Sequence, residues 1–363
     1  MHFHTIPQTN RSDTSVQIPS ASIVVPAYNE ESIITENLNI LYDYMESFEL
    51  DISWEIIIVN DGSTDSTGQM AEDFAQSHKN VHVCHHRANF GLGQALRTAF
   101  NKCRGDYVVT IDLDLSYSPD HIGLLLTEIL NTQVQIVIAS PYMKGGKLTN
   151  IPYLRKILSK LANRLLSVVA SGKIRTLTGL VRAYDRKFLK ALNLKAMDME
   201  VNPEIIYKAQ LLRARIIEIP AHLDWSYFKS AGKSRRSGFR MLRSIIASLM
   251  SAFIFRPFMF FIAMGIFLFS ISLYIIVWIF IHVFSIYSTI QSSGGYFDDR
   301  FTIAVAEVFR DRPHAFLIGG FILVIAVQIL SLGILSLQKK RYFEELFHLS
   351  TTRFDDNFRN GHK

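Results

Sequence analysis

The sequence predicts an α/β protein with a mostly parallel sheet, helices on both faces of that sheet, and two C-terminal membrane-spanning helices. Short apolar runs alternate with helical patterns between residues 21 and 225, and polar motifs directly follow several of these runs. Near the C-terminus, two stretches of more than twenty residues carry no charge. Repeated strand–helix–strand units form a parallel sheet that binds ligands at the carboxyl ends of its strands.

The predicted elements follow one another in strict alternation. A proline ends the first apolar run at Pro26, and glycine at Gly62 supplies the sharp turn after the second. Ser63 or Thr64 can cap the helix that follows. We expect strands at 22–26, 54–59, 81–84, 106–112 and 134–139, and helices at 30–48, 66–77, 91–102 and 120–130.

The central apolar run leads into two aspartates, Asp112 and Asp114. In an extended segment, residues i and i+2 share a face, so both carboxylates can reach one crevice. Two such anions repel each other unless a cation lies between them, and carboxylate oxygens suit Mg²⁺ or Mn²⁺ shared with phosphates. The pair therefore predicts a metal site for a diphosphate ligand. The alternative is an acidic turn that caps the helix beginning near Pro119.

Three further polar turns follow predicted strands. Residues 26–30 open a helix whose free N–H groups favour an anion. Residues 60–66 leave Asp61 at a strand tip, where we expect it to face the crevice. Residues 89–93 place glycines at a helix start, which alone is a weak phosphate-loop signal. Residues 60–66 are also compatible with an ordinary turn, and the order of all four motifs at strand ends is what indicates a ligand-binding crevice.

Composition places part of the chain in lipid. Hydrophobic residues make up 49% of the sequence and mean hydropathy is +0.18. Residues 257–281 and 315–337 are uncharged. As a helix, each run would be about 35 Å long, enough to cross a hydrocarbon core of roughly 30 Å. We therefore predict two transmembrane helices. The alternative, a buried pair in a soluble protein, rarely runs so long without charge.

Charge flanking the two runs predicts their orientation. Basic residues precede the first run and follow the second, at Lys233, Arg235, Arg236, Arg240, Arg243, Arg256, Lys339, Lys340 and Arg341. The positive-inside rule then makes the large domain (21–238) and the tail (338–363) cytoplasmic, with residues 282–314 outside. This predicts an integral membrane protein of a prokaryotic plasma membrane or the endoplasmic reticulum.

The remaining segments carry weaker signals. Residues 1–20 are rich in Ser, Thr and Gln without an apolar core, so we expect no fixed structure there. Apolar residues recur at helical spacing in 239–256, which predicts a juxtamembrane amphipathic helix in the headgroup plane. Alternatively, this helix packs on the soluble domain or extends the first span.

Net charge and cysteine content indicate which kinds of partner and metal the chain could bind. The net charge of +6 indicates a membrane surface more than a nucleic acid. Two isolated cysteines, Cys84 and Cys103, are too few for a zinc site and fit a reducing compartment. We expect no nucleic-acid partner. The sequence is compatible with either a monomer or a homo-oligomer.

The motifs together resemble glycosyltransferase family 2, which has the GT-A fold, and most closely its polyprenyl-phosphate branch. The matching segments are VVPAYNE at 24–30, VNDGSTDST at 59–67, RANFGLGQAL at 87–96, DLD at 112–114, RKILSKLAN at 155–163, LTGLVRAYDR at 177–186 and EVNPEIIYKA at 200–209. The resemblance covers nearly all of residues 21–240 and the presence of C-terminal spans.

That resemblance implies a role for particular residues. The nucleotide would be held by Pro26, Tyr28, Glu30 and Asp61. Metal and diphosphate would be held by Asp112 and Asp114, and the donor phosphates by Arg155 and Ser159. The acceptor phosphate would be faced by Arg182, Lys233, Ser234 and Arg235.

Two positions depart from the branch. A glutamine that usually contributes to the metal site is Ser116, which can still ligate through its hydroxyl or a water. An arginine that usually binds phosphate is Pro141, which has neither charge nor donor. Lys144, Lys147 or Lys156 could supply the missing charge.

The expected function is an inverting, metal-dependent transfer of a sugar from a nucleoside-diphosphate sugar to polyprenyl phosphate at the cytoplasmic membrane face. A processive polysaccharide synthase needs a Gln-x-x-Arg-Trp motif that this sequence lacks. A second alternative is a non-catalytic protein of the same fold that senses nucleotide sugar or acts as a scaffold for a flippase, and the residues Pro141 and Ser116 are the reason to consider it.

Overall fold

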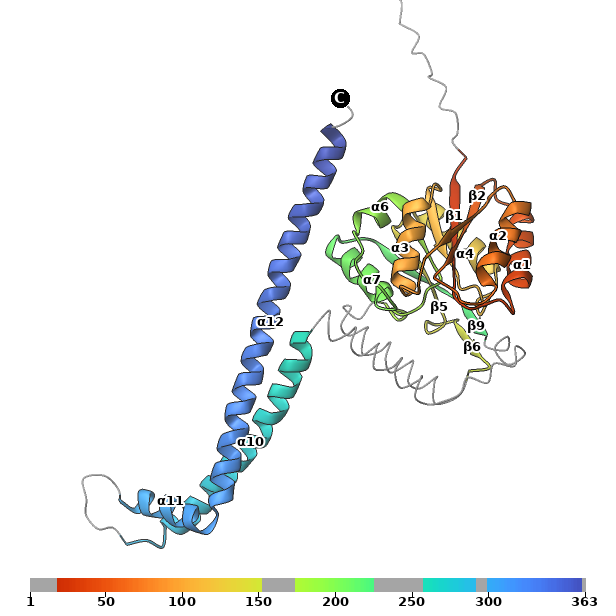
Figure 1. The fold of residues 1–363 in the computed structure, drawn as a ribbon. Coiled ribbons are helices and arrows are strands. Elements are labelled where there is room, and N and C mark those ends of the chain that lie inside the picture. Colours follow the sequence, from red (N-terminus) through yellow and green to blue (C-terminus); the bar gives the residue numbers. More distant parts are fainter. Residues whose placement is uncertain (1–17, 152–173, 225–256, 292–298, 361–363) are drawn as a thin grey trace, which may run out of the picture. The chain divides into compact units, whose positions relative to one another are not determined.

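The computed structural model describes residues 18–151, 174–224, 257–291 and 299–360. Two compact units lie within Met1–Ser248 and Leu249–Lys363, and each is described by itself (Figure 1). Most of the segment predicted to lack structure, and all of the predicted amphipathic helix at 239–256, lie outside the described residues.

The first unit contains a seven-stranded sheet in the order β3-β2-β1-β4-β7-β5-β8. Its strands are β1 (Ser20–Ala27), β2 (Ser53–Asn60), β3 (Val81–His85), β4 (Tyr107–Thr110), β5 (Ile136–Ser140), β7 (Arg182–Asp185) and β8 (Ile216–Pro220). Strand β1 pairs in parallel with β2 and β4, and β5 pairs in parallel with β8. The mostly parallel sheet predicted from sequence is therefore confirmed.

Strand β7 was not among the predicted strands. It runs antiparallel to both β4 and β5 and lies between them, so that Arg182 is in register with Thr110 on one side and Ile138 on the other. Its sequence, RAYD, carries charges at both ends and gives no apolar run. Only tertiary contacts could identify it as a central strand.

Helices cover both faces of this sheet, as predicted (Figure 1). They are α1 (Ile34–Glu46), α2 (Thr67–Ser77), α3 (Leu92–Lys102), α4 (Asp120–Thr132), α6 (Arg186–Ala191) and α7 (Val201–Leu211). The apolar faces of α1, α2 and α4 share one core with alternate residues of β1 and β2. Helix α3 contacts β1, β2, α6 and α7. Helix α1 begins four residues later than predicted, because residues 28–33 form a turn.

A second, two-stranded sheet joins β6 (Lys147–Thr149) to β9 (His222–Asp224) in parallel. The backbone N–H of Asp224 donates to the carbonyl of Ser116 over 2.9 Å, which ties this small sheet to the turn that follows β4. The described chain stops two residues after β6 and directly after β9. These two described ends lie together, because the amide of Asn150 donates to Asp224 Oδ1 over 2.7 Å.

The second unit is a helical hairpin of α10 (Pro257–Tyr287) and α12 (Pro313–Asn360), which run side by side (Figure 1). Pro257–Tyr287 and Pro313–Leu346 are long and apolar enough to cross a membrane, so both predicted spans are candidate membrane spans in the structure. Glycine keeps the helices close: a Cβ added at Gly265 would lie 2.6 Å from Leu330 Cγ. The Ser272 hydroxyl donates to the carbonyl of Gly319 over 2.9 Å.

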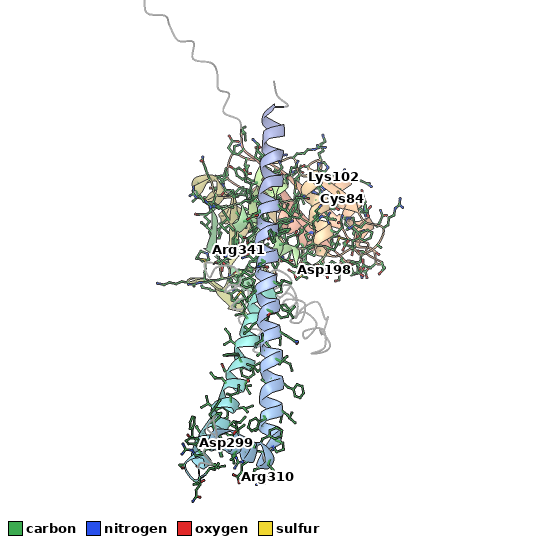
Figure 2. The ribbon with its side chains drawn as sticks, turned by 90° about the vertical axis from the view of Figure 1, so that its left-hand side faces the viewer. Cys84, Lys102, Asp198, Asp299, Arg310 and Arg341 are labelled. Carbon is green, nitrogen blue, oxygen red and sulfur yellow. The ribbon has the colours of Figure 1, made fainter. Side chains whose placement is uncertain are left out.

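The connection between these helices contains α11 (Asp299–Asp311), which the sequence did not predict because charges interrupt its apolar pattern. Its buried residues Ala304 and Val308 pack on Ile279 and Val283 of α10. Figure 2 shows Asp299 and Arg310 at one end of the hairpin and Arg341 farther along α12. Helix α12 continues through most of the predicted tail, as far as Asn360.

Candidate functional site

The two aspartates lie in a turn after β4 and not on the strand itself. Strand β4 ends at Thr110, and the turn is closed by Leu115 N–H donating to Asp112 O over 3.2 Å, with Leu115 at φ 46°. The predicted extension of the strand to residue 112 is therefore wrong. Leu113 between them points into the core, where it is 4% exposed. Asp112 and Asp114, on either side of this leucine, are only partly exposed.

Asp112 and Asp114 are close enough to influence each other. Burial, followed by the negative charge of Asp114, holds the pKa of Asp112 well above the usual carboxyl range. Asp114 Oδ1 accepts the backbone N–H of Ser116 over 2.9 Å, which fixes the second carboxylate against the turn. The turn thus brings two carboxyl groups together at the carboxyl end of the sheet.

This donor set fits a divalent cation. Two carboxylates supply hard oxygen ligands, and their mutual repulsion is the condition that a bound cation relieves. In the described part of the chain, no group of three or more His, Cys, Asp or Glu side chains could hold a metal ion. A cation here would therefore rely on Asp112, Asp114, the Ser116 hydroxyl, water and ligand phosphates.

Tyr117 and Arg182 lie beside the same turn, and sequence reasoning missed Tyr117. The pKa of the Tyr117 phenol is raised by burial and then by the charge of Asp112, so the hydroxyl keeps its proton. Arg182 is 0% exposed; its guanidinium donates to the carbonyls of Asn202 (3.1 Å) and Leu177 (2.7 Å). The guanidinium of Arg182 is thus buried and held by two backbone carbonyls. The role of this residue toward the acceptor stays a prediction.

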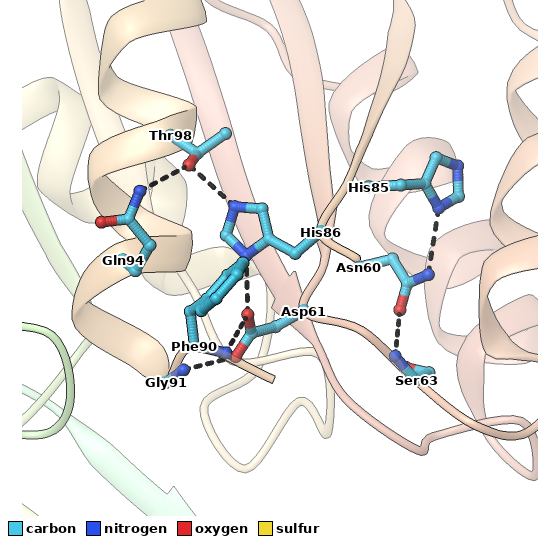
Figure 3. A network of polar contacts seen from close by, with 9 residues as sticks. All are labelled: Asn60, Asp61, Ser63, His85, His86, Phe90, Gly91, Gln94 and Thr98. Carbon is cyan, nitrogen blue, oxygen red and sulfur yellow. Dashed lines mark hydrogen bonds and ion pairs between the residues drawn. The ribbon is translucent and has the colours of Figure 1, made fainter. Parts of the chain in front are cut away.

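Asp61 is the centre of a hydrogen-bond network (Figure 3). Its carboxylate accepts from His86 Nδ1 (2.6 Å), Phe90 N (3.0 Å) and Gly91 N (2.8 Å), and the residue is 4% exposed. Asp61 follows directly after β2, and its carboxylate is buried by the segment before α3. Three donors leave it little capacity for a ligand, so it primarily fixes the segment before α3. Contact with a nucleotide stays a prediction.

The turn after β1 is joined to the turn after β2. Asn29, at φ 54°, accepts the N–H of Thr64 over 2.9 Å and donates its own N–H to Ser63 Oγ over 3.0 Å. The N–H of Glu30 donates to Thr67 Oγ1 over 2.8 Å. Tyr28 is 44% exposed at the end of β1. The structure thus brings the predicted 26–30 and 60–66 motifs together at one edge of the sheet.

The side chains of Glu204 and Lys208 serve the structure. Glu204 accepts the N–H groups of Lys195 and Ala196 and lies 2.7 Å from the ammonium of Lys208. Lys208 also donates to the carbonyl of Asn193 over 2.7 Å. These contacts hold the 193–197 segment, whose carbonyl at Met197 accepts the N–H of Gln94 in α3. Glu204 is thereby committed to this segment.

The remaining predicted site residues divide into two groups. Pro141 is buried directly after β5, whereas Lys144 is exposed on the loop that follows and Lys147 is exposed at the start of β6. The other group lies outside the described residues, so the positions of its members stay predictions: Arg155, Lys156, Ser159, Lys233, Ser234 and Arg235.

Comparison with known proteins identifies the class. Residues 22–192 match the model of glycosyl transferase family 2. A dolichyl-phosphate beta-glucosyltransferase of Trichomonas vaginalis is 30% identical over 222 residues, which are 58% of this chain and 68% of that protein. A dolichol-phosphate mannosyltransferase of Pyrococcus furiosus is 29% identical over 230 residues, 62% of each chain. The glucosyl-3-phosphoglycerate synthase of Mycobacterium tuberculosis, solved with Mn²⁺ and UDP, is 22% identical, with a TM-score of 0.48 over 64% of this chain and 80% of that one.

The chain belongs to glycosyl transferase family 2. Its mixed sheet with helices on both faces is of the GT-A type that the motifs implied. The matched segment spans 62% of the length of the Pyrococcus protein.

Proposed function

We propose that this protein transfers a sugar from a nucleoside-diphosphate sugar to a polyprenyl phosphate, with inversion and with a divalent metal ion, at the cytoplasmic face of a membrane. The Pyrococcus and Trichomonas relatives are named for the same acceptor, dolichyl phosphate, but for different sugars, mannose and glucose. Their shared feature supports a dolichyl or undecaprenyl phosphate acceptor. The sugar is left to experiment.

One structural observation carries the proposal. The Asp112–Asp114 turn is tied to β9 through Ser116 and Asp224, and β9 pairs with β6. The sequence that continues from β6 holds Arg155, Lys156 and Ser159, and the sequence that continues from β9 holds Lys233, Ser234 and Arg235. The described ends that lead into these two basic stretches of sequence lie together beside the aspartate turn, which supports a site for two phosphorylated substrates.

The reaction requires little acid–base chemistry from the protein. A phosphate monoester has a second pKa of about 6, so the acceptor oxygen is already largely anionic at neutral pH. Glu204 is engaged by backbone N–H groups and Lys208, which supports a scheme without a general base. A Mg²⁺ or Mn²⁺ ion held by Asp112, Asp114 and Ser116 would supply charge neutralisation for the departing diphosphate.

The remaining work is positioning. Arg155, Lys156 and Ser159 would orient the donor phosphates, while Lys233, Ser234 and Arg235 would bind the acceptor phosphate. A single displacement from the opposite side of the anomeric carbon gives inversion. The candidate spans would hold the domain at the bilayer, where a long-chain lipid phosphate is found.

The test is direct transfer. Membranes containing the full chain are incubated with a panel of nucleotide sugars and polyprenyl phosphate, and the lipid product is identified by mass. We expect one sugar to be transferred, and the anomeric configuration of the product to be opposite to that of the donor. The Asp114→Asn protein is the matched control and should give no product.

A different outcome would favour the non-catalytic alternative. The observation that favours this alternative is that Pro141 has no charge with which to bind a phosphate. If the unmodified protein binds a nucleotide sugar but transfers nothing to any polyprenyl phosphate, sensing or scaffolding becomes the better description.

A further inference from the structure

One polar side chain of α12 lies in the middle of the candidate span without a hydrogen-bond partner. Gln328 is nine residues before Leu337 and thirteen after Ala315, within the uncharged run. At 1.5 Å per residue these are about 14 and 20 Å, so its amide would lie near the centre of a core roughly 30 Å thick. A glutamine side chain is too short to reach either interface from there.

Gln328 differs from the serines of the same spans. The hydroxyls of Ser270, Ser272 and Ser331 donate to backbone carbonyls of the hairpin at 2.9 Å each. The amide of Gln328 is exposed and makes no hydrogen bond within the part of the chain that the structure describes. Lipid tails offer neither donor nor acceptor, so this amide needs a protein partner in the bilayer.

The position of Gln328 on α12 excludes the neighbouring helix as that partner. The side of α12 that packs on α10 carries Gly319, Ala326 and Gly333. Gln328 is nine residues from Gly319, which corresponds to two and a half helical turns. Gln328 therefore lies on the opposite side of α12 from Gly319. The side of α12 that carries Gln328 also carries four other exposed residues, at the three- and four-residue spacing that lets one helix contact another: Phe321, Val324, Ser331 and Leu335.

We propose that this face of α12 pairs with the same face of a second copy of the chain, with the two Gln328 amides hydrogen-bonded to each other. A twofold axis along the membrane normal brings identical residues together at identical depth. An amide carries both an acceptor and donors, so two copies satisfy each other. The isoprenoid part of a lipid acceptor has no polar group at that depth and cannot substitute. The proposal rests on α12 spanning the membrane but not on sugar transfer.

The first test measures association of the full chain in phosphatidylcholine liposomes without substrates. After co-flotation has established insertion, energy transfer between donor- and acceptor-labelled copies is followed as the lipid-to-protein ratio rises. We expect Gln328→Leu to weaken pairing at least tenfold and Gln328→Asn to retain part of it. Ser270→Ala, on α10, is the matched control and should pair like the unmodified chain, because that hydroxyl already donates to the carbonyl of Ile266.

The second test locates the contact. In a background with Cys84→Ala and Cys103→Ala, Gln328→Cys should form an oxidant-dependent disulfide between copies. Ala326→Cys, at similar depth but facing α10, should not. A monomeric unmodified chain, unchanged pairing of Gln328→Leu, or crosslinking of position 328 only to a different protein would each overturn the proposal. Failure to insert would overturn the span on which it rests, independently of any transfer activity.

Discussion

His86 Nδ1 lies 2.6 Å from Asp61 Oδ1, and this contact joins the end of β3 to the end of β2. Because a carboxylate only accepts, His86 is the donor. Its other nitrogen lies 2.8 Å from Thr98 Oγ1 in α3. Asp61 also accepts from the N–H groups of Phe90 and Gly91. Together these bonds fix the start of α3 against the edge of the sheet where the site motifs meet.

The first prediction concerns His86. Replacing it with alanine should destabilise the fold by about 1.5–3 kcal/mol, since a hydrogen bond to a carboxylate is lost. His86→Asn can place an amide nitrogen near the Nδ1 position and should recover part of that loss. Thermal unfolding measures the stability, and donor affinity by calorimetry measures the site. Equal stability of the alanine and asparagine variants would contradict the assigned role.

The second prediction concerns metal removal. EDTA should abolish transfer, and Mg²⁺ or Mn²⁺ should restore it. In EDTA, Asp114→Asn should be more thermostable than the unmodified protein, because it removes the charge that helps to raise the pKa of Asp112. A carboxyl pKa that is raised on folding costs stability as pH rises above the pKa of the unfolded state, and the full cost is about 1.4 kcal/mol per unit of pKa shift. Full activity of Asp114→Asn in EDTA would refute the site.

The third prediction separates structure from catalysis at Glu204 and Lys208, which are 4% and 7% exposed. Lys208→Ala leaves Glu204 without its buried partner, and we expect unfolding to become easier by about 3–5 kcal/mol. Below the unfolding temperature, the turnover of each folded molecule should be nearly unchanged. A specific loss of turnover in a fully folded Glu204→Gln protein would instead indicate a catalytic carboxylate.

The fourth prediction concerns Arg182. Arg182→Lys should destabilise the first unit, because a lysine cannot serve the carbonyls of both Leu177 and Asn202 with the geometry of a guanidinium. Activity should fall only as far as the protein unfolds. The variant should therefore have a lowered Tm, and the molecules that remain folded should have an unchanged KM for the lipid. A raised lipid KM at unchanged Tm would restore a direct role in acceptor binding.

The fifth prediction concerns topology. A cysteine at Thr302, on α11, should react in intact cells with a membrane-impermeant thiol reagent, whereas one at Tyr342 should react only after lysis. The native thiols give little background: burial raises the pKa of Cys84, and it raises that of Cys103 to about 12, so both stay protonated and slow to react near pH 8. The reverse labelling pattern would overturn the orientation.

The sequence alone determined the order of strands and helices through residue 140, because each apolar run has its own length and period. It also identified both candidate spans, since more than twenty uncharged residues leave few alternatives. The family followed from the order of four polar motifs at strand ends. These signals are local in the chain, so they can be read without knowing which parts meet.

Only the tertiary structure decided what depends on contacts between distant residues. Strand β7 lies between β4 and β5 although its sequence is charged, because neighbours on both sides satisfy its backbone. Asp61 and Arg182 carry the residue types expected of a binding site, and the structure adds that both are buried and hydrogen-bonded to backbone groups of neighbouring segments. Burial and partner geometry set the role of a charged side chain, and neither is encoded in the position of that residue along the chain.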